Sequence, residues 1–108
     1  MNLLFVCSMN KWRSPTAEAI FKNHPFYSVK SAGVSASARI RLSEKMISWA
    51  DLIFVMEKNH KQRIKELYDA SLNNIEIIVL DIADDYQFMD PELIEILKQS
   101  VSPYLEHF

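Results

Sequence analysis

The 108-residue sequence predicts an α/β fold, a three-layer domain in which helices cover both faces of a four-stranded parallel sheet. Two observations lead to this prediction. The short apolar runs are mostly continuous, which is typical of strands buried on both faces. Segments with helical periodicity separate these runs, as the connections between parallel strands require. The chain shows no repeat and no linker, so one domain is expected over residues 1–108.

Four segments are expected to form the strands. The first is the apolar run that ends in Cys7, and the third is an unbroken apolar run of the same length. The second alternates apolar and polar residues, and the fourth is a further apolar run. In chain order, the strands are expected at residues 3–7, 27–31, 52–56 and 75–80.

Four segments with apolar residues at helical spacing complete the pattern. Ser14 has the side chain of an N-cap, and Pro15 suits the first position of the helix that follows. Asp90 and Pro91 open the last helix in the same way, and Pro103 is expected to break or bend it. The helices are expected from residue 14, around residues 42–49, over residues 58–68 and from residue 90.

Cys7, the only cysteine, lies at the carboxyl end of the first expected strand, where open parallel sheets bind their ligands. Five residues separate it from Arg13, which is followed by Ser14 at the start of a helix. The N–H groups of residues 8–13 can converge on one anion, and the helix N-terminus adds its positive dipole end. Arg13 offers a fork for two phosphate oxygens, and the same field stabilises a thiolate. The pattern therefore predicts a phosphate site with a covalent step.

The loop between Cys7 and Arg13 contains no glycine. Loops that curl round a phosphate usually need a residue at positive φ, and glycine adopts that conformation most readily. The only glycine of the chain, Gly33, lies elsewhere. Asn10 is expected to take the left-handed conformation instead, because asparagine tolerates it. The alternative is that Cys7 is only a small buried hydrophobic residue at a strand end.

The chain resembles the low-molecular-weight protein tyrosine phosphatase family, whose motif is Cys, two residues, Asn, two residues, Arg-Ser-Pro and a helix with Ala and Glu. The matching residues are Cys7, Asn10, Arg13, Ser14, Pro15, Ala17 and Glu18. Weaker matches are Ser-Ala-Gly at 31–33, the segment 50–56 that ends in Met, and Asp-Pro at 90–91. The resemblance covers most of the chain, which would be a short, divergent member of the family.

This resemblance implies a protein tyrosine phosphatase that works through a phosphocysteine. Cys7 would be the nucleophile, and Arg13 would hold the phosphoryl oxygens. Ser14 would donate a hydrogen bond to the sulfur, and Asp90 would be the general acid. The substrate-binding residues of the loop would be Ser8, Met9, Asn10, Lys11 and Trp12.

The sequence departs from the family pattern at positions that shape the substrate cleft. Met9 replaces a glycine, and Trp12 stands where many members have a second cysteine. Trp12 could form a wall for an aromatic ring, or simply pack. The aromatic pair that commonly follows the family's Asp-Pro is absent here. Because Asp90 before Pro91 is also a good helix N-cap on its own, Asp84 or Asp85, with Asp81 behind them, could be the acid instead.

Charge and cysteine count exclude several classes of protein. Residues 1–65 carry a net charge of about +7 and residues 66–108 about −9, so the basic half contains the thiol. A sequence pI of about 5.9 argues against general nucleic-acid binding. A lone cysteine indicates a reduced, cytoplasmic protein, and no apolar run could span a membrane. We expect a monomer without metal or cofactor that acts on a phosphorylated protein or a small aryl phosphate.

Three other functions stay open. An arsenate reductase on the same scaffold would need an external thiol, because the chain has no second cysteine for an internal relay. A phosphocysteine carrier of the sugar-transport type generally lacks the arginine found here at position 13. A catalytically inactive module could bind phosphorylated proteins without turnover.

Overall fold

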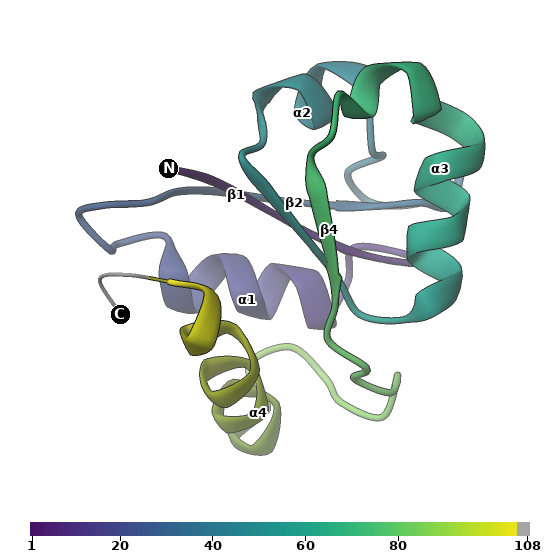
Figure 1. The fold of residues 1–108 in the computed structure, drawn as a ribbon. Helices are drawn as coiled ribbons and strands as arrows, with labels where there is room; N and C mark the ends of the chain where they lie inside the picture. The colour runs from purple at the N-terminus through teal and green to yellow at the C-terminus, as the bar shows by residue number, and fades with distance from the viewer. Residues whose placement is uncertain (106–108) are drawn as a thin grey trace.

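The computed structural model describes residues 1–105, and these form one sheet between two layers of helices (Figure 1). All strand pairs are parallel, and the strand order is β2-β1-β3-β4. The strands are β1 (Asn2–Cys7), β2 (Ser28–Gly33), β3 (Leu52–Val55) and β4 (Glu76–Val79). The predicted fold class is confirmed, and each strand lies within two residues of its expected place.

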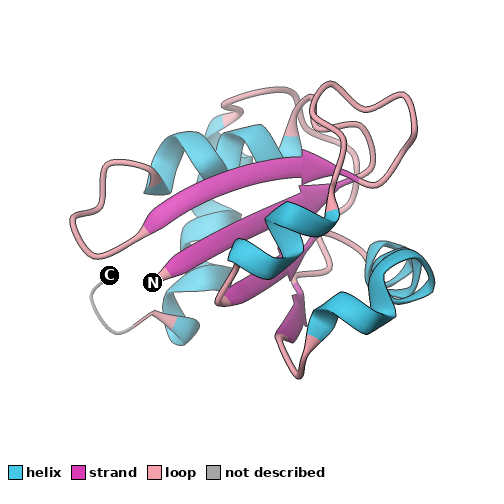
Figure 2. Ribbon diagram, turned by 90° about the horizontal axis from the view of Figure 1, so that it is seen from above, coloured by secondary structure: helices cyan, strands magenta, loops and turns pink. Residues whose placement is uncertain are grey.

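Helices cover both faces of this sheet, α1 and α4 on one face and α2 and α3 on the other (Figures 1 and 2). They are α1 (Arg13–Phe21), α2 (Glu44–Trp49), α3 (Lys58–Leu72) and α4 (Pro91–Val101), followed by a short 3-10 helix η1 (Ser102–Tyr104). Among residues 1–105, no helix has both the length and the apolar composition needed to cross a membrane.

The side chains of β1 alternate between two separate hydrophobic cores. Phe5 points toward α1 and α4, where its ring stacks on Phe21 at 5.6 Å and on Phe54 at 5.0 Å. Leu4 and Val6 point to the opposite core, beneath α2 and α3. Because both faces are covered, the strand must be apolar at every position, which explains the continuous run seen in the sequence.

The start of α1 differs from the prediction. The helix begins at Arg13, and Trp12 occupies the N-cap position without a side-chain capping bond. Ser14 was expected to be the cap, but it lies inside the first turn, fully buried. Its hydroxyl contacts the sulfur of Cys7 at 2.9 Å and does not cap the N-terminus of α1.

The other helix ends follow local sequence signals. Ser43 caps α2 by accepting a hydrogen bond from the backbone N–H of Met46. Asp90 caps α4 as predicted, with Pro91 at its first position. The predicted break near Pro103 is also confirmed, since α4 ends at Val101 and the chain continues as η1.

The carboxyl ends of the strands meet at one edge of the sheet. β1 lies between β2 and β3, so the winding direction reverses beside it, at the point where such folds place their ligands. Two connections are important at this edge: the β1–α1 loop (residues 8–12) and the β4–α4 loop (residues 80–90).

Candidate active site

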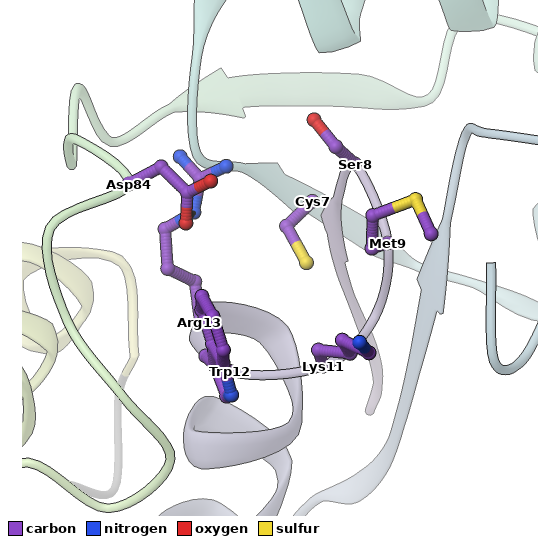
Figure 3. A pocket seen from close by; sticks show the side chains of 7 residues that line it. All are labelled: Cys7, Ser8, Met9, Lys11, Trp12, Arg13 and Asp84. Carbon is purple, nitrogen blue, oxygen red and sulfur yellow. Dashed lines mark ion pairs between the residues drawn. The ribbon is translucent and has the colours of Figure 1, made fainter.

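The β1–α1 loop and the first turn of α1 enclose a cavity of about 210 Å³. Figure 3 shows the sulfur of Cys7 inside it, with Arg13 and Asp84 on one side of the sulfur and Ser8 and Met9 on the other. Six of the predicted site residues thus lie around one space, together with one carboxylate. The lining residues are Cys7, Ser8, Met9, Lys11, Trp12, Arg13 and Asp84.

Asn10 provides the bend of the β1–α1 loop. Its backbone has φ 55°, so the expected left-handed residue is found at the expected position. The side chain is fully buried and donates to the hydroxyls of Ser14 and Ser31, each at 2.9 Å. Ser31 in turn donates to Glu18 at 2.5 Å. This buried network fixes the loop from beneath, so the loop keeps its shape without a glycine of its own.

The single glycine of the chain lies directly under this loop. A Cβ at Gly33 would be 2.5 Å from the carbonyl oxygen of Ser8 and 2.6 Å from the Cβ of Ala38. It would also be 3.0 Å from the backbone nitrogen of Asn10. Glycine is therefore required here by the close approach of the β1–α1 loop backbone and the Ala38 side chain, and not by an unusual φ.

The nucleophile candidate, Cys7, is 3% exposed and lies 2.9 Å from the hydroxyl oxygen of Ser14. That oxygen accepts from Asn10, and its proton can be donated to the carbonyl of Ala32 at 3.3 Å. When the sulfur is a thiolate, the same proton can be donated to it instead. Ser14 can therefore respond to the charge that develops on the sulfur.

Arg13 is held by groups from two other segments, Glu57 after β3 and the β4–α4 loop. Its side chain is only 2% exposed, and Nη1 donates to Oε2 of Glu57 at 2.6 Å and to the carbonyl oxygen of Ile82 at 2.8 Å. Nε lies 3.5 Å from Oδ1 of Asp84. Because a guanidinium is planar, these contacts fix the orientation of the whole fork.

The carboxylate at the cavity is Asp84, whereas Asp90 was the predicted general acid. Asp84 lines the cavity and is 59% exposed, so it can reach both Arg13 and an incoming ligand. Asp90 accepts a hydrogen bond from the backbone N–H of Glu92 at the start of α4, and it is not among the residues that line the cavity. The structure therefore places the alternative carboxylate, not the predicted one, beside Cys7.

His60, at the start of α3, supports the loop from behind. Its Nδ1 accepts from the backbone N–H of Glu57 at 3.1 Å, so the ring proton is on Nε2 and faces the hydroxyl of Ser8 at 2.8 Å. Figure 3 shows this hydroxyl directed away from the sulfur. Burial, reinforced by the nearby charge of Arg13, lowers the pKa of His60 from 6.5 to about 4. The ring is therefore neutral at physiological pH.

Sequence reasoning did not identify three residues that support the site. Glu57 and His60 follow β3, and their signal was their position after a strand that ends at the same edge as Cys7. Arg39 is the third, since its Nε donates to the carbonyl oxygen of Asn10 at 3.0 Å. No local pattern marks Arg39, because the contact depends on how residues 34–40 fold over the sheet edge.

Comparisons with known proteins agree with this geometry. The family model for the low molecular weight phosphotyrosine protein phosphatases matches residues 2–50. The protein-arginine-phosphatase of Bacillus subtilis (strain 168) is 33% identical over 91 residues, an alignment that covers 59% of this chain and 61% of that protein. The matched region thus spans less than two thirds of that relative's length.

Solved structures match over nearly the whole chain. The YwlE arginine phosphatase from Geobacillus stearothermophilus has a TM-score of 0.71 at 25% identity, covering 94% of this chain and 86% of that chain. The tyrosine phosphatase Wzb from Escherichia coli K30, in complex with phosphate, has a TM-score of 0.76 at 20% identity, covering 95% and 94%. At 20% identity, the match with Wzb shows that the two proteins share a fold, and no more. Together with the motif and its geometry, these findings show that the chain has the fold of the low molecular weight phosphotyrosine protein phosphatases and that its residues 2–50 are similar to the model of this family.

Proposed function

We propose that the protein is a phosphomonoester hydrolase that works through a phosphocysteine on Cys7 and prefers aryl phosphates such as phosphotyrosine. One observation carries this proposal. A thiol, residues of the β1–α1 loop, an immobilised arginine and a carboxylate all border one cavity of about 210 Å³. Each of these four groups has a separate task in the transfer of a phosphoryl group to sulfur.

In the first step, the Cys7 thiolate attacks phosphorus in line with the leaving oxygen. An S–P bond forms as the P–O bond to the substrate breaks. Arg13 and the N–H groups of the β1–α1 loop hold the three equatorial oxygens, where the charge is concentrated. The contacts of Arg13 with Glu57 and Ile82 fix the fork before substrate arrives, so little reorganisation is needed.

Asp84 would manage the proton in both steps. In the first step, its carboxylic acid protonates the leaving oxygen, which matters for a phenol because its pKa is near 10. In the second step, the resulting carboxylate takes a proton from water, and the hydroxide attacks phosphorus. The S–P bond breaks, inorganic phosphate is released, and Ser14 donates a hydrogen bond to the sulfur as negative charge returns to it.

The cavity mouth favours a flat, uncharged leaving group. Trp12 is 41% exposed and Met9 is 36% exposed, so both present apolar surface to a ring that follows the phosphate. Lys11 adds a positive charge to the same lining. This charge attracts the phosphate dianion and does not oppose a neutral phenol ring.

Phosphoarginine is the second candidate substrate. Two findings favour it: the 33% identity with a protein-arginine-phosphatase, and the exposed carboxylate of Asp84 at the cavity. A guanidinium leaving group carries positive charge, which Asp84 would attract and Lys11 would repel. Rates on a phosphotyrosine peptide and on a phosphoarginine peptide of the same sequence would decide between the two substrates.

The activity is tested with aryl phosphates of increasing leaving-group pKa. We expect wild type to hydrolyse all of them and Cys7→Ser to lose turnover by at least about 10⁴-fold. For Asp84→Asn we expect a loss of roughly 10²–10³-fold on phenyl phosphate that shrinks as the leaving group becomes more acidic. Asp90→Asn is the matched control, and its turnover should stay near wild type.

Other results would point elsewhere. Wild-type turnover by Cys7→Ser would exclude the covalent route. A leaving-group-dependent loss in Asp90→Asn, with Asp84→Asn silent, would restore Asp90 as the acid. Tight binding of phosphopeptide without hydrolysis would indicate an inactive binding module. Arsenate reduction that requires an added thiol would indicate a reductase.

A further inference from the structure

We infer that Thr16 is a positioning residue that couples the β1–α1 loop to the β4–α4 loop and so sets the orientation of Asp84. The inference rests on the proposed function, in which Asp84 is the general acid. Thr16 lies in the first turn of α1 with 0% of its side chain exposed, and it does not line the cavity. Any effect on the reaction must therefore pass through the residues that it contacts.

The hydroxyl of Thr16 bonds to both loops at once. Oγ1 donates to the carbonyl oxygen of Trp12 at 2.6 Å, at the end of the β1–α1 loop. The same oxygen accepts from the backbone N–H of Met89 at 2.9 Å, near the end of the β4–α4 loop. Its proton and a lone pair thus have defined partners 77 residues apart along the chain, at positions 12 and 89.

The start of the β4–α4 loop is anchored by backbone bonds, in which the N–H groups of Leu80 and Ile82 donate to the carbonyl oxygens of Val55 and Met56, each at 2.8 Å. Three further contacts join the loop to α1. Near its start, the carbonyl of Ile82 accepts from Arg13, and in its middle Asp84 pairs with the same guanidinium at 3.5 Å. Near its end, the bond from Met89 to Thr16 ties it to α1. These three contacts go to the first turn of α1, whereas the backbone bonds at the start of the loop go to β3 and Met56. From Asp84 onward, α1 therefore supplies the bonds that hold the loop.

Two bends at positive φ lie on either side of Asp84. Asp81 has φ 57° and Met89 has φ 62°, although neither is a glycine. Methionine is uncommon in this region, because its Cβ crowds the backbone. The bond to Thr16 satisfies the N–H of Met89 in this conformation. Without it, this N–H would lose its partner in the protein and the loop would be free to relax to a different bend.

The expected consequence concerns proton transfer and not phosphate binding. A displaced Asp84 would fail to reach the leaving oxygen, while Cys7 and Arg13 would still engage the phosphoryl group. The loss should therefore be greatest when the leaving group needs a proton. It should vanish when the leaving group is already acidic.

The test uses Thr16→Val, which keeps the shape of the side chain and removes the hydroxyl, and Thr16→Ser, which restores it. We compare kcat/KM on phenyl phosphate and on 2,4-dinitrophenyl phosphate, since kcat/KM reports the step in which the leaving group departs. We expect Thr16→Val to lose about tenfold on phenyl phosphate and less than about twofold on the dinitrophenyl ester. Thr16→Ser should stay within about twofold of wild type on both.

Competitive inhibition by inorganic phosphate serves as the control for the β1–α1 loop, and its inhibition constant should not change in Thr16→Val. An equal loss on both esters, or weaker phosphate inhibition, would overturn the inference, because Thr16 would then shape the anion site itself. The inference would also be overturned if kcat/KM of Thr16→Val equals wild type on both esters while the loss in Asp84→Asn depends on the leaving group. The proposed function would then stand. If the loss of kcat/KM in Asp84→Asn does not depend on the leaving group, Asp84 is not the general acid and the proposed function fails at that point. If Thr16→Val does not fold, Thr16→Ala removes the same hydroxyl with less bulk.

Discussion

The two loops at the active edge of the sheet are built in different ways. The β1–α1 loop is short and rests on a buried hydrogen-bond network around Asn10, with Gly33 packed directly beneath it. The β4–α4 loop is longer, and most of its residues are exposed, including Asp84. It is tied to the first turn of α1 through Arg13 and Thr16.

The difference corresponds to two separate tasks. A loop that holds a phosphoryl group gains from rigidity, because preorganised donors need not move during the reaction. A loop that delivers a proton must let substrate and water pass, so exposure is compatible with its task. Substitutions under the first loop should therefore affect stability and activity together, whereas substitutions along the second should mainly affect proton transfer.

The largest effect is expected for Arg13→Lys, because Arg13 contacts both loops. A lysine cannot hold two phosphate oxygens and the groups of Glu57 and Ile82 in one plane, so we expect kcat/KM to fall on the order of 10³-fold. Steady-state kinetics on an aryl phosphate measure this loss. Arg63→Lys, in an exposed ion pair on α3, is the matched control and should retain wild-type activity. Equal rates for the two variants would show that the fork is dispensable.

The next effect is a pH dependence of stability from His60, behind the β1–α1 loop. Burial lowers the pKa of His60 to about 4 in the folded protein, against an ordinary value of 6.5, so between these pH values the unfolded chain binds a proton that the folded protein does not. Stability should therefore fall as pH falls from 6.5 to 4, by about 3 kcal/mol in total. Urea unfolding from pH 8 to pH 4 measures this dependence.

The control for this effect is His60→Gln, which cannot titrate. Above pH 7 the two proteins should differ by a constant free energy of unfolding. Below pH 6.5 the difference should narrow, because only the wild type loses the contribution of the neutral imidazole. Parallel pH profiles for the two proteins would contradict the assigned neutral state of His60.

A smaller loss of stability is expected for Gly33→Ala, which tests the support beneath the β1–α1 loop. The added Cβ would lie 2.5 Å from the carbonyl oxygen of Ser8, so backbone must move, at a cost of roughly 1–3 kcal/mol. Phosphate inhibition should weaken in parallel, since the proposed anion site uses the same backbone. Combining the change with Ala38→Gly relieves the contact at 2.6 Å but not the one with Ser8, so rescue should be partial. Full rescue would mean that the loop itself is not strained.

The smallest effect is expected for Lys11→Gln, which alters the cavity mouth but none of the contacts that hold the two loops in place. Removing one positive charge should raise the ratio of phosphoarginine to phosphotyrosine hydrolysis by roughly three- to tenfold. Matched peptides that carry either residue measure this ratio, and Lys22→Gln, outside the cavity lining, is the control. An unchanged ratio in Lys11→Gln would show that this charge does not select the substrate.

The sequence was most informative where chemistry is local. The spacing from Cys7 to Arg13, the asparagine between them and the apolar run before them are all consecutive, so a short-range pattern predicts the strand, the turn and the helix start. The left-handed conformation of Asn10 follows from the same reasoning. Within this stretch, only the predicted capping role of Ser14 was wrong, because its hydroxyl contacts the sulfur of Cys7 and does not cap the helix.

The acid was harder to assign, because Asp84 and Asp90 lie in one loop and both have plausible local roles. An Asp-Pro pair is a good helix start whatever else it does, and here Asp90 makes the capping bond. Which carboxylate faces Cys7 depends on the path of the β4–α4 loop, and that path is set by contacts with α1. No neighbouring residue encodes those contacts.

The sequence alone therefore determined the fold class and the strand–loop–helix segment that carries Cys7, Asn10 and Arg13, since hydrophobic periodicity and consecutive spacing are local properties of the chain. Tertiary structure decided which acid enters the cavity, how Glu57 and His60 support it, and why the single glycine lies under the loop and not in it. These three features depend on contacts between segments that are distant in sequence and meet only when the strands align at one edge of the sheet.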